Sequence, residues 1–124
     1  MMLSNNKIKA FISTTQPALA REFYTKKIGL KLISEDSYGI ELDANGAHLR
    51  ISFVKELSPQ PFTILGWDTE DIVSTIKLLN AKGISCERYS FIEQDESGIW
   101  TAPGGTRVAW FKDPDGNLLS LSDY

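Results

Sequence analysis

WFKDPDGNLLSLSDY, residues 110–124, is the stretch of sequence that decides the fold of this chain. Pro114 fixes a backbone φ angle that suits a tight turn, and Gly116 accepts a positive φ angle. After the turn, LLSLS alternates apolar and small polar residues, which is typical of a half-buried strand. The stretch therefore predicts a strand, a tight turn and a second strand.

The residues upstream of this hairpin complete a second module, at about 62–124. FTILGW (62–67) predicts a strand, and Asp68 or Thr69 is the expected N-cap of a helix that ends at Gly83. The helix has an apolar stripe at helical spacing. Three further segments have the composition of strands: 84–91, 98–103 and 106–113.

The first part of the chain, about 7–54, repeats the same order of elements. Pro17 begins a helix that Gly29 ends, and strands are expected at 7–14, 30–36, 38–46 and 47–54. A polar, proline-bearing linker, 55–61, separates the two modules. Both halves thus read β, α, β, β, β, which predicts an α+β fold built from two copies of one unit. Each copy has a curled, mixed sheet with its helix on the outer face, and the two form a cup.

Length and composition narrow the classes of protein. At 124 residues the chain fits a single domain, 1–124, and a net charge of −3 argues against a nucleic-acid partner. No apolar run approaches the roughly 20 residues of a membrane helix, and the N-terminus lacks the apolar core of a signal peptide. One cysteine excludes an internal disulfide and a cysteine-cluster zinc site. We therefore expect a cytoplasmic protein without a membrane partner.

Three segments carry a resemblance to a known family: REFYTKKIGLKL (21–32), DIVSTIKLLNAKGI (71–84) and WFKDPDGNLLSL (110–121). In these segments the chain resembles the vicinal oxygen chelate superfamily, which includes glyoxalase I, bleomycin-resistance proteins, fosfomycin-resistance enzymes and extradiol dioxygenases. The resemblance covers nearly the whole chain. It implies paired βαβββ modules, usually completed as a homodimer whose clefts bind small organic molecules.

The resemblance also implies four metal-ligand positions, and this chain does not fill them. They fall on Lys9, on His48 or Arg50, near Ile64, and on Ser120. A protonated lysine has no lone pair and repels a dication, and isoleucine has no donor atom. A divalent ion needs three or four donors with compensating charge. We therefore predict that the fold is kept without a metal site and without a cofactor.

The candidate ligand-binding residues are Lys9, Phe11, His48, Arg50, Ile64, Trp100, Trp110 and Ser120. Two readings of this set stay open. Lys9, Arg50 and Ser120 predict an anion-binding patch, unless Arg50 pairs with Glu41 across the hairpin. Trp67, Trp100 and Trp110, with the acidic loop 92–97, favour a planar or cationic ligand, unless the tryptophans pack in the core or a dimer interface, which we expect for Trp67.

Three functions remain in competition. The first is a metal-independent small-molecule binding protein of glyoxalase/bleomycin-resistance type that sequesters a drug or metabolite. The second is an enzyme, which we favour less: a glyoxalase-like lyase or isomerase, either metal-free with His48 as the catalytic base or metal-dependent through another ligand set. The third is a regulatory or scaffolding dimer with a vestigial cleft. The sequence identifies neither the ligand nor its charge.

Overall fold

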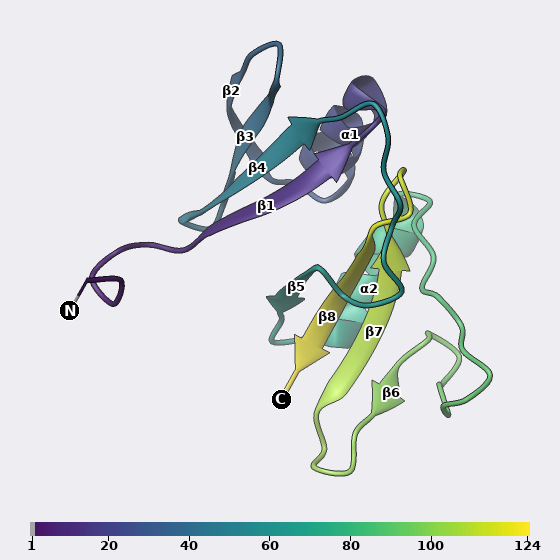
Figure 1. The fold of residues 1–124 in the computed structure, drawn as a ribbon. Coiled ribbons are helices and arrows are strands. Elements are labelled where there is room, and N and C mark those ends of the chain that lie inside the picture. Colours follow the sequence, from purple (N-terminus) through teal and green to yellow (C-terminus); the bar gives the residue numbers. More distant parts are fainter. Residues whose placement is uncertain (1) are drawn as a thin grey trace. The chain divides into compact units, whose positions relative to one another are not determined.

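The computed structural model describes residues 2–124 and divides into two compact units, one ending at Ser58 and one running from Pro59 to Tyr124 (Figure 1). Within the described residues, each unit has a four-stranded sheet and one α-helix in the order β, α, β, β, β. The predicted α+β class with two βαβββ modules is confirmed. The boundary between the units falls inside the polar stretch 55–61.

The first unit contains β1 (Lys9–Thr14), α1 (Pro17–Glu22), a π-helical turn η1 (Phe23–Lys27), β2 (Lys31–Glu35), β3 (Gly39–Ala44) and β4 (Ala47–Phe53). Its strand order is β1-β4-β3-β2, with β1 parallel to β4 and the other neighbours antiparallel. Alternation along the strands buries Ile12, Leu49 and Ile51 on one face. The other face carries Lys9, Phe11, His48 and Arg50.

The second unit contains β5 (Leu65–Asp68), α2 (Ile72–Ala81), β6 (Trp100–Thr101), β7 (Arg107–Lys112) and β8 (Leu118–Asp123). Its strand order is β5-β8-β7-β6, again with one parallel pair, β5 and β8. One sheet face packs against α2 and buries Ala109, Phe111 and Leu119. The opposite face carries Trp110, Leu118 and Ser120, because side chains alternate along a strand.

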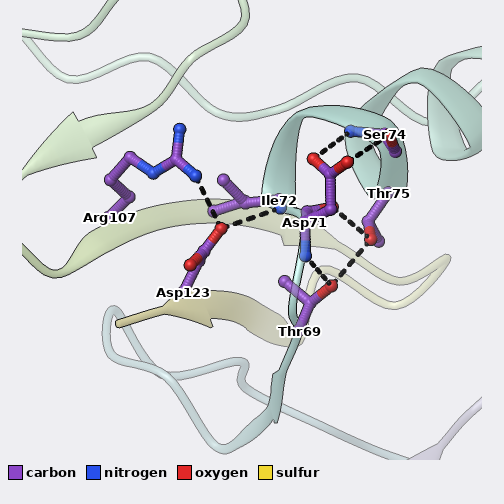
Figure 2. Close-up of polar contacts among 7 residues, drawn as sticks. All are labelled: Thr69, Asp71, Ile72, Ser74, Thr75, Arg107 and Asp123. Carbon is purple, nitrogen blue, oxygen red and sulfur yellow. Dashed lines mark hydrogen bonds and ion pairs between the residues drawn. The ribbon is translucent and has the colours of Figure 1, made fainter.

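The start of α2 is held by side chains from three parts of the second unit (Figure 2). Asp71 is the N-cap residue, and its carboxylate accepts hydrogen bonds from the backbone N–H and the hydroxyl of Ser74. Asp123, at the end of β8, accepts from the backbone N–H of Ile72 and from Arg107. The last strand of the chain is thereby joined to the first turn of the helix.

Four details of the predicted elements are wrong. The helix cap is Asp71 instead of Asp68 or Thr69, because the Thr69 N–H continues the sheet ladder to Ser122. The first helix does not stay α-helical up to Gly29: Ile28 donates to the carbonyl of Phe23, five residues back.

The other two differences lie between α2 and β7. The stretch 84–91 forms no strand, and the predicted strand 98–103 shrinks to the two residues of β6. The carboxylate of Asp95 accepts a hydrogen bond from the Ile99 N–H. The Ala102 N–H donates to the Thr106 carbonyl across a turn. The first bond gives the Ile99 N–H to a side chain, and the second lies in the turn that continues the register of β6 and β7.

Candidate ligand-binding cleft

An aromatic cleft of about 370 Å³ lies in the second unit, on the sheet face opposite α2. Trp100, Trp110 and Leu118 reach it from β6, β7 and β8. The remaining walls come from two segments without regular structure, one before β5 and one between α2 and β6. The lining residues are Pro61, Phe62, Thr63, Tyr89, Phe91, Ile92, Trp100, Trp110 and Leu118.

Four of the lining rings contact one another in a chain. Trp100 and Trp110 have ring centroids 6.1 Å apart, and Tyr89 meets Trp110 edge to face at 5.7 Å. Phe91 lies 5.3 Å from Tyr89 and is 80 % exposed. Edge-to-face and tilted pairs at these separations are favourable arrangements for aromatic rings. The cleft therefore offers both ring faces and ring edges to a flat guest.

The cleft wall is uncharged at neutral pH. None of the nine lining side chains is an acid or a base other than the phenol of Tyr89. Burial, together with the nearby carboxylate of Glu87, raises the pKa of Tyr89 above its ordinary value of 10.0, so the phenol stays protonated. The part of a ligand that enters here has to be apolar or neutral, because a buried unpaired charge is costly.

An acidic cavity of about 410 Å³ adjoins the aromatic cleft and shares Trp100 with it. Its other lining residues are Glu93, Gln94, Asp95, Ile99 and Thr101. Asp95 uses one carboxylate oxygen to accept from the N–H groups of Ser97 and Ile99. Glu93 makes no hydrogen bond or ion pair with any residue from 2 to 124, so its charge is available to a ligand.

The predicted residues of the first unit lie together on one face of its sheet. In the strand register, Lys9 is opposite His48 and Phe11 is opposite Arg50. His48 is exposed, whereas Phe11, at 65 % exposure, has the Lys9 ammonium 5.6 Å from its ring centre. Among residues 2–124, His48 has no hydrogen-bonding or ionic partner.

Both cations of this face are already paired with acids. Lys9 Nζ lies 2.5 Å from Glu41 Oε1, while Arg50 lies 3.4 Å from Asp36 and 4.0 Å from Glu41. Hydrogen bonding from the Tyr38 N–H, aided by the charge of Arg50, lowers the pKa of Asp36, so this carboxylate is ionised at neutral pH. An incoming anion would have to displace these carboxylates.

The remaining metal-ligand positions lie in the second unit and supply one donor. Ile64 precedes β5, and the residue opposite Ser120 in the β5–β8 register is Gly66. A Cβ atom at Gly66 would lie 2.7 Å from Ser120 Oγ, so no larger side chain fits there without a shift. Across the described residues 2–124, no three His, Cys, Asp or Glu side chains are grouped to hold a metal ion. The residues at the expected positions do not fit a divalent metal.

The structure brings together part of the predicted set within each unit. Trp100 and Trp110 line one cleft, while Trp67 stacks on Phe111 on the α2 side of the sheet. Sequence reasoning missed Phe62, Tyr89 and Phe91 as lining residues. The available signal was that Tyr89 and Phe91 are two residues apart and could face one cleft, but this spacing is equally typical of the strand predicted over 84–91.

Comparison with known families and structures finds a match over most of the chain. The model of the Glyoxalase/Bleomycin resistance protein/Dioxygenase superfamily matches residues 8–121. A comparison with curated proteins finds no match.

Several solved structures share the fold at low sequence identity. A glyoxalase/bleomycin resistance protein/dioxygenase from Alicyclobacillus acidocaldarius is 24 % identical, with a TM-score of 0.71 over 100 % of this chain and 95 % of that one. A superfamily member from Sphaerobacter thermophilus is 20 % identical, with a TM-score of 0.76 over 100 % of both chains. The lactoylglutathione lyase of Agrobacterium tumefaciens is 13 % identical, with a TM-score of 0.74 over 96 % and 93 %. At these identities the likeness establishes the fold.

Proposed function

The chain belongs to the glyoxalase/bleomycin resistance protein/dioxygenase superfamily, and we propose that it is a metal-independent binding protein for a small organic molecule with a planar aromatic part. The observation that carries this proposal is the aromatic cleft of the second unit. Its volume lies within the roughly 300–1,000 Å³ of small-molecule sites, and its lining is mostly apolar and aromatic, as in such sites.

The charge of the ligand follows from what surrounds the cleft. The neutral aromatic wall favours a flat, uncharged ring system, and the adjoining cavity with Glu93 and Asp95 favours a cationic group attached to it. An anionic ligand has less support, because Lys9 and Arg50 already pair with Glu41 and Asp36. A protonated amine beside a tryptophan face also gains a cation–π contribution. We therefore favour an aromatic amine over an aromatic acid.

An enzymatic function has less support than binding. His48 is exposed and has no partner within residues 2–124 that would orient it or tune it as a base. The positions that the resemblance assigns to metal ligands supply too few donors for a catalytic metal. Sequestration of a drug or metabolite needs only a shaped cleft. The homodimer and the cytoplasmic location remain predictions; no helix among residues 2–124 is long and apolar enough to span a membrane.

The proposal is tested with three naphthalene probes of similar size: 1-naphthylmethylamine, 1-naphthalenemethanol and 1-naphthoate. We expect quenching or shifting of tryptophan emission on titration, with the cationic probe binding several-fold more tightly than the anionic one. At 100 times its Kd, a probe should raise the free energy of unfolding by about 2.7 kcal/mol.

Trp110→Ala should weaken probe binding by about tenfold or more, because it removes a central aromatic anchor of the cleft. Tyr38→Ala is the matched control: it removes an exposed aromatic ring from the first unit and should bind the probes like the unchanged protein. Failure of all three probes to bind or stabilise the protein would reject the proposal and favour a vestigial cleft.

A further inference from the structure

The outer wall of the aromatic cleft is carried by a segment that the sheet barely supports. Tyr89, Phe91 and Ile92 belong to the stretch between α2 and β6, which has no strand. One backbone bond ties this stretch to the sheet: the Glu87 N–H donates to the Trp110 carbonyl at 2.7 Å. Loops held this weakly are ordinarily mobile, yet a binding wall has to be placed to within a fraction of an ångström.

The side chain of Gln94 supplies the missing pairing. Its Oε1 accepts from the Tyr89 N–H at 2.8 Å, and its Nε2 donates to the carbonyls of Glu87 and Gly98, each at 2.9 Å. One half-buried amide thus joins the two sides of the loop at three backbone groups. Only a side chain with both an acceptor and two donors can make this set of bonds.

Arg88 reinforces the same loop from its exposed side. Its two terminal nitrogens each donate, at 2.6 Å, to the carbonyls of Asp95 and Glu96. These bonds close the loop but do not reach Tyr89. Gln94 is therefore the side chain that fixes the backbone of Tyr89, whose ring meets Trp110 edge to face.

We propose that Gln94 is a positioning residue of the aromatic cleft: its amide holds the Tyr89 ring against Trp110 and so sets the affinity for the ligand. This inference rests on the proposed binding function. Gln94 acts through Tyr89 rather than as an anchor of the aromatic ring system. Loss of the Gln94 amide should leave the cleft in place, but the Tyr89 ring in its wall should become mobile.

The decisive variant is Gln94→Glu, which has nearly the same shape. At neutral pH its carboxylate can still accept but cannot donate to the carbonyls of Glu87 and Gly98. We expect cationic-probe affinity to fall about three- to tenfold, although the added charge alone would favour this probe. The near-ultraviolet circular dichroism of the aromatic cluster should weaken while the far-ultraviolet spectrum is kept.

Protonation supplies a readout that a merely structural role would not show. When the pH falls through the ordinary glutamate pKa of about 4.3, the carboxyl group introduced by Gln94→Glu regains a donor, and part of the near-ultraviolet signal of the variant should return. The unchanged protein should show no such recovery. Gln94→Ala should lose both affinity and signal at every pH, and Gln16→Ala, in the first unit, is the matched control that should lose neither.

The two proposals fail in different ways. If the unchanged protein binds no probe, the proposed function fails, and the near-ultraviolet signal still tests the role of Gln94. If the unchanged protein binds and both Gln94 variants bind equally well with unaltered spectra, the positioning role is overturned and the binding function stands. Loss of the far-ultraviolet spectrum in both variants would also overturn it, because Gln94 would then be a determinant of folding.

Discussion

Asp123 shows how a single buried side chain can join two elements. It is 7 % exposed and accepts from both the backbone N–H of Ile72, at 3.1 Å, and Arg107, at 2.7 Å (Figure 2). The two bonds differ in how much they contribute to the stability of the fold. Arg107 is half-exposed, so its ion pair is screened by water and contributes little, whereas a buried N–H without an acceptor is costly.

We therefore expect Asp123→Ala to lower the free energy of unfolding by about 1–3 kcal/mol and Asp123→Asn by less than about 1 kcal/mol. Asparagine keeps an acceptor for the Ile72 N–H and gives up only the charge. Urea unfolding followed by circular dichroism measures both values. Equal losses in the two variants would mean that the ion pair with Arg107 dominates.

At the residue scale, the sequence revealed some members of the cleft and not others. Trp100 and Trp110 were candidates for an aromatic cleft because three tryptophans are many for a chain of this length, and both line a cleft in the structure. Trp67 is half-buried and stacks on Phe111, away from this cleft. Tyr89 and Phe91 were missed because their segment has the composition of a strand, whereas in the structure the Tyr89 N–H donates to the side chain of Gln94. Hydrogen bonds from a side chain to backbone groups four to seven residues away leave no periodic pattern in the sequence.

The N-terminus of α2 is an element whose stability should depend on pH. Hydrogen bonds from the hydroxyl and then the N–H of Ser74 lower the pKa of Asp71 below its ordinary value of 3.8. A lowered folded-state pKa means that the ionised carboxylate stabilises the fold above the ordinary pKa. This contribution is lost as the pH falls through the lowered value.

Asp71→Ala should accordingly lower the melting temperature by a few degrees at about pH 7, because the helix loses its N-cap. The difference from the unchanged protein should narrow below about pH 4, as Asp71 takes up a proton. Melting curves between about pH 7 and pH 3 test this. Asp71→Asn, which keeps a capping oxygen without titrating, separates the charge from the cap; a difference independent of pH would contradict the role of the charge.

Elements marked by a single turn or capping residue were predictable, and those that depend on hydrogen bonds from side chains to the backbone were not. Gly83 follows α2 and Gly29 follows the π-helical turn η1, with positive φ angles of 82° and 92°, so both glycines stop a helical segment as the repeated sequence pattern predicted. The segment 84–91 has strand composition, but the side chain of Gln94 bonds to the Glu87 carbonyl and the Tyr89 N–H, which a sheet would otherwise pair. Cys86 also packs closely against Gly98: a Cβ atom built on Gly98 would lie 2.7 Å from the Cβ atom of Cys86.

At the scale of the whole molecule, the question is what a superfamily fold does without the donors for its metal. The four positions fall on Lys9, on His48 or Arg50, near Ile64, and on Ser120. They bring one imidazole and one hydroxyl, against a requirement for three or four donors and compensating negative charge. Lys9 adds repulsion, and its ammonium already engages one carboxylate oxygen of Glu41.

We therefore expect zinc, nickel and manganese to leave the melting temperature of tag-free protein unchanged, and a chelator to leave probe binding unchanged. A specific ion at 100 times its Kd would add about 2.7 kcal/mol to the free energy of unfolding, which a melting curve detects easily. His48→Gln is the control, because one exposed imidazole can bind zinc weakly without forming a site. Stoichiometric metal that stabilises the protein and is retained by His48→Gln would mean that other residues hold the ion, and metal independence would then be wrong. Stabilisation that disappears in this variant, at millimolar metal only, would instead reflect His48 alone and leave the aromatic cleft as the basis of function.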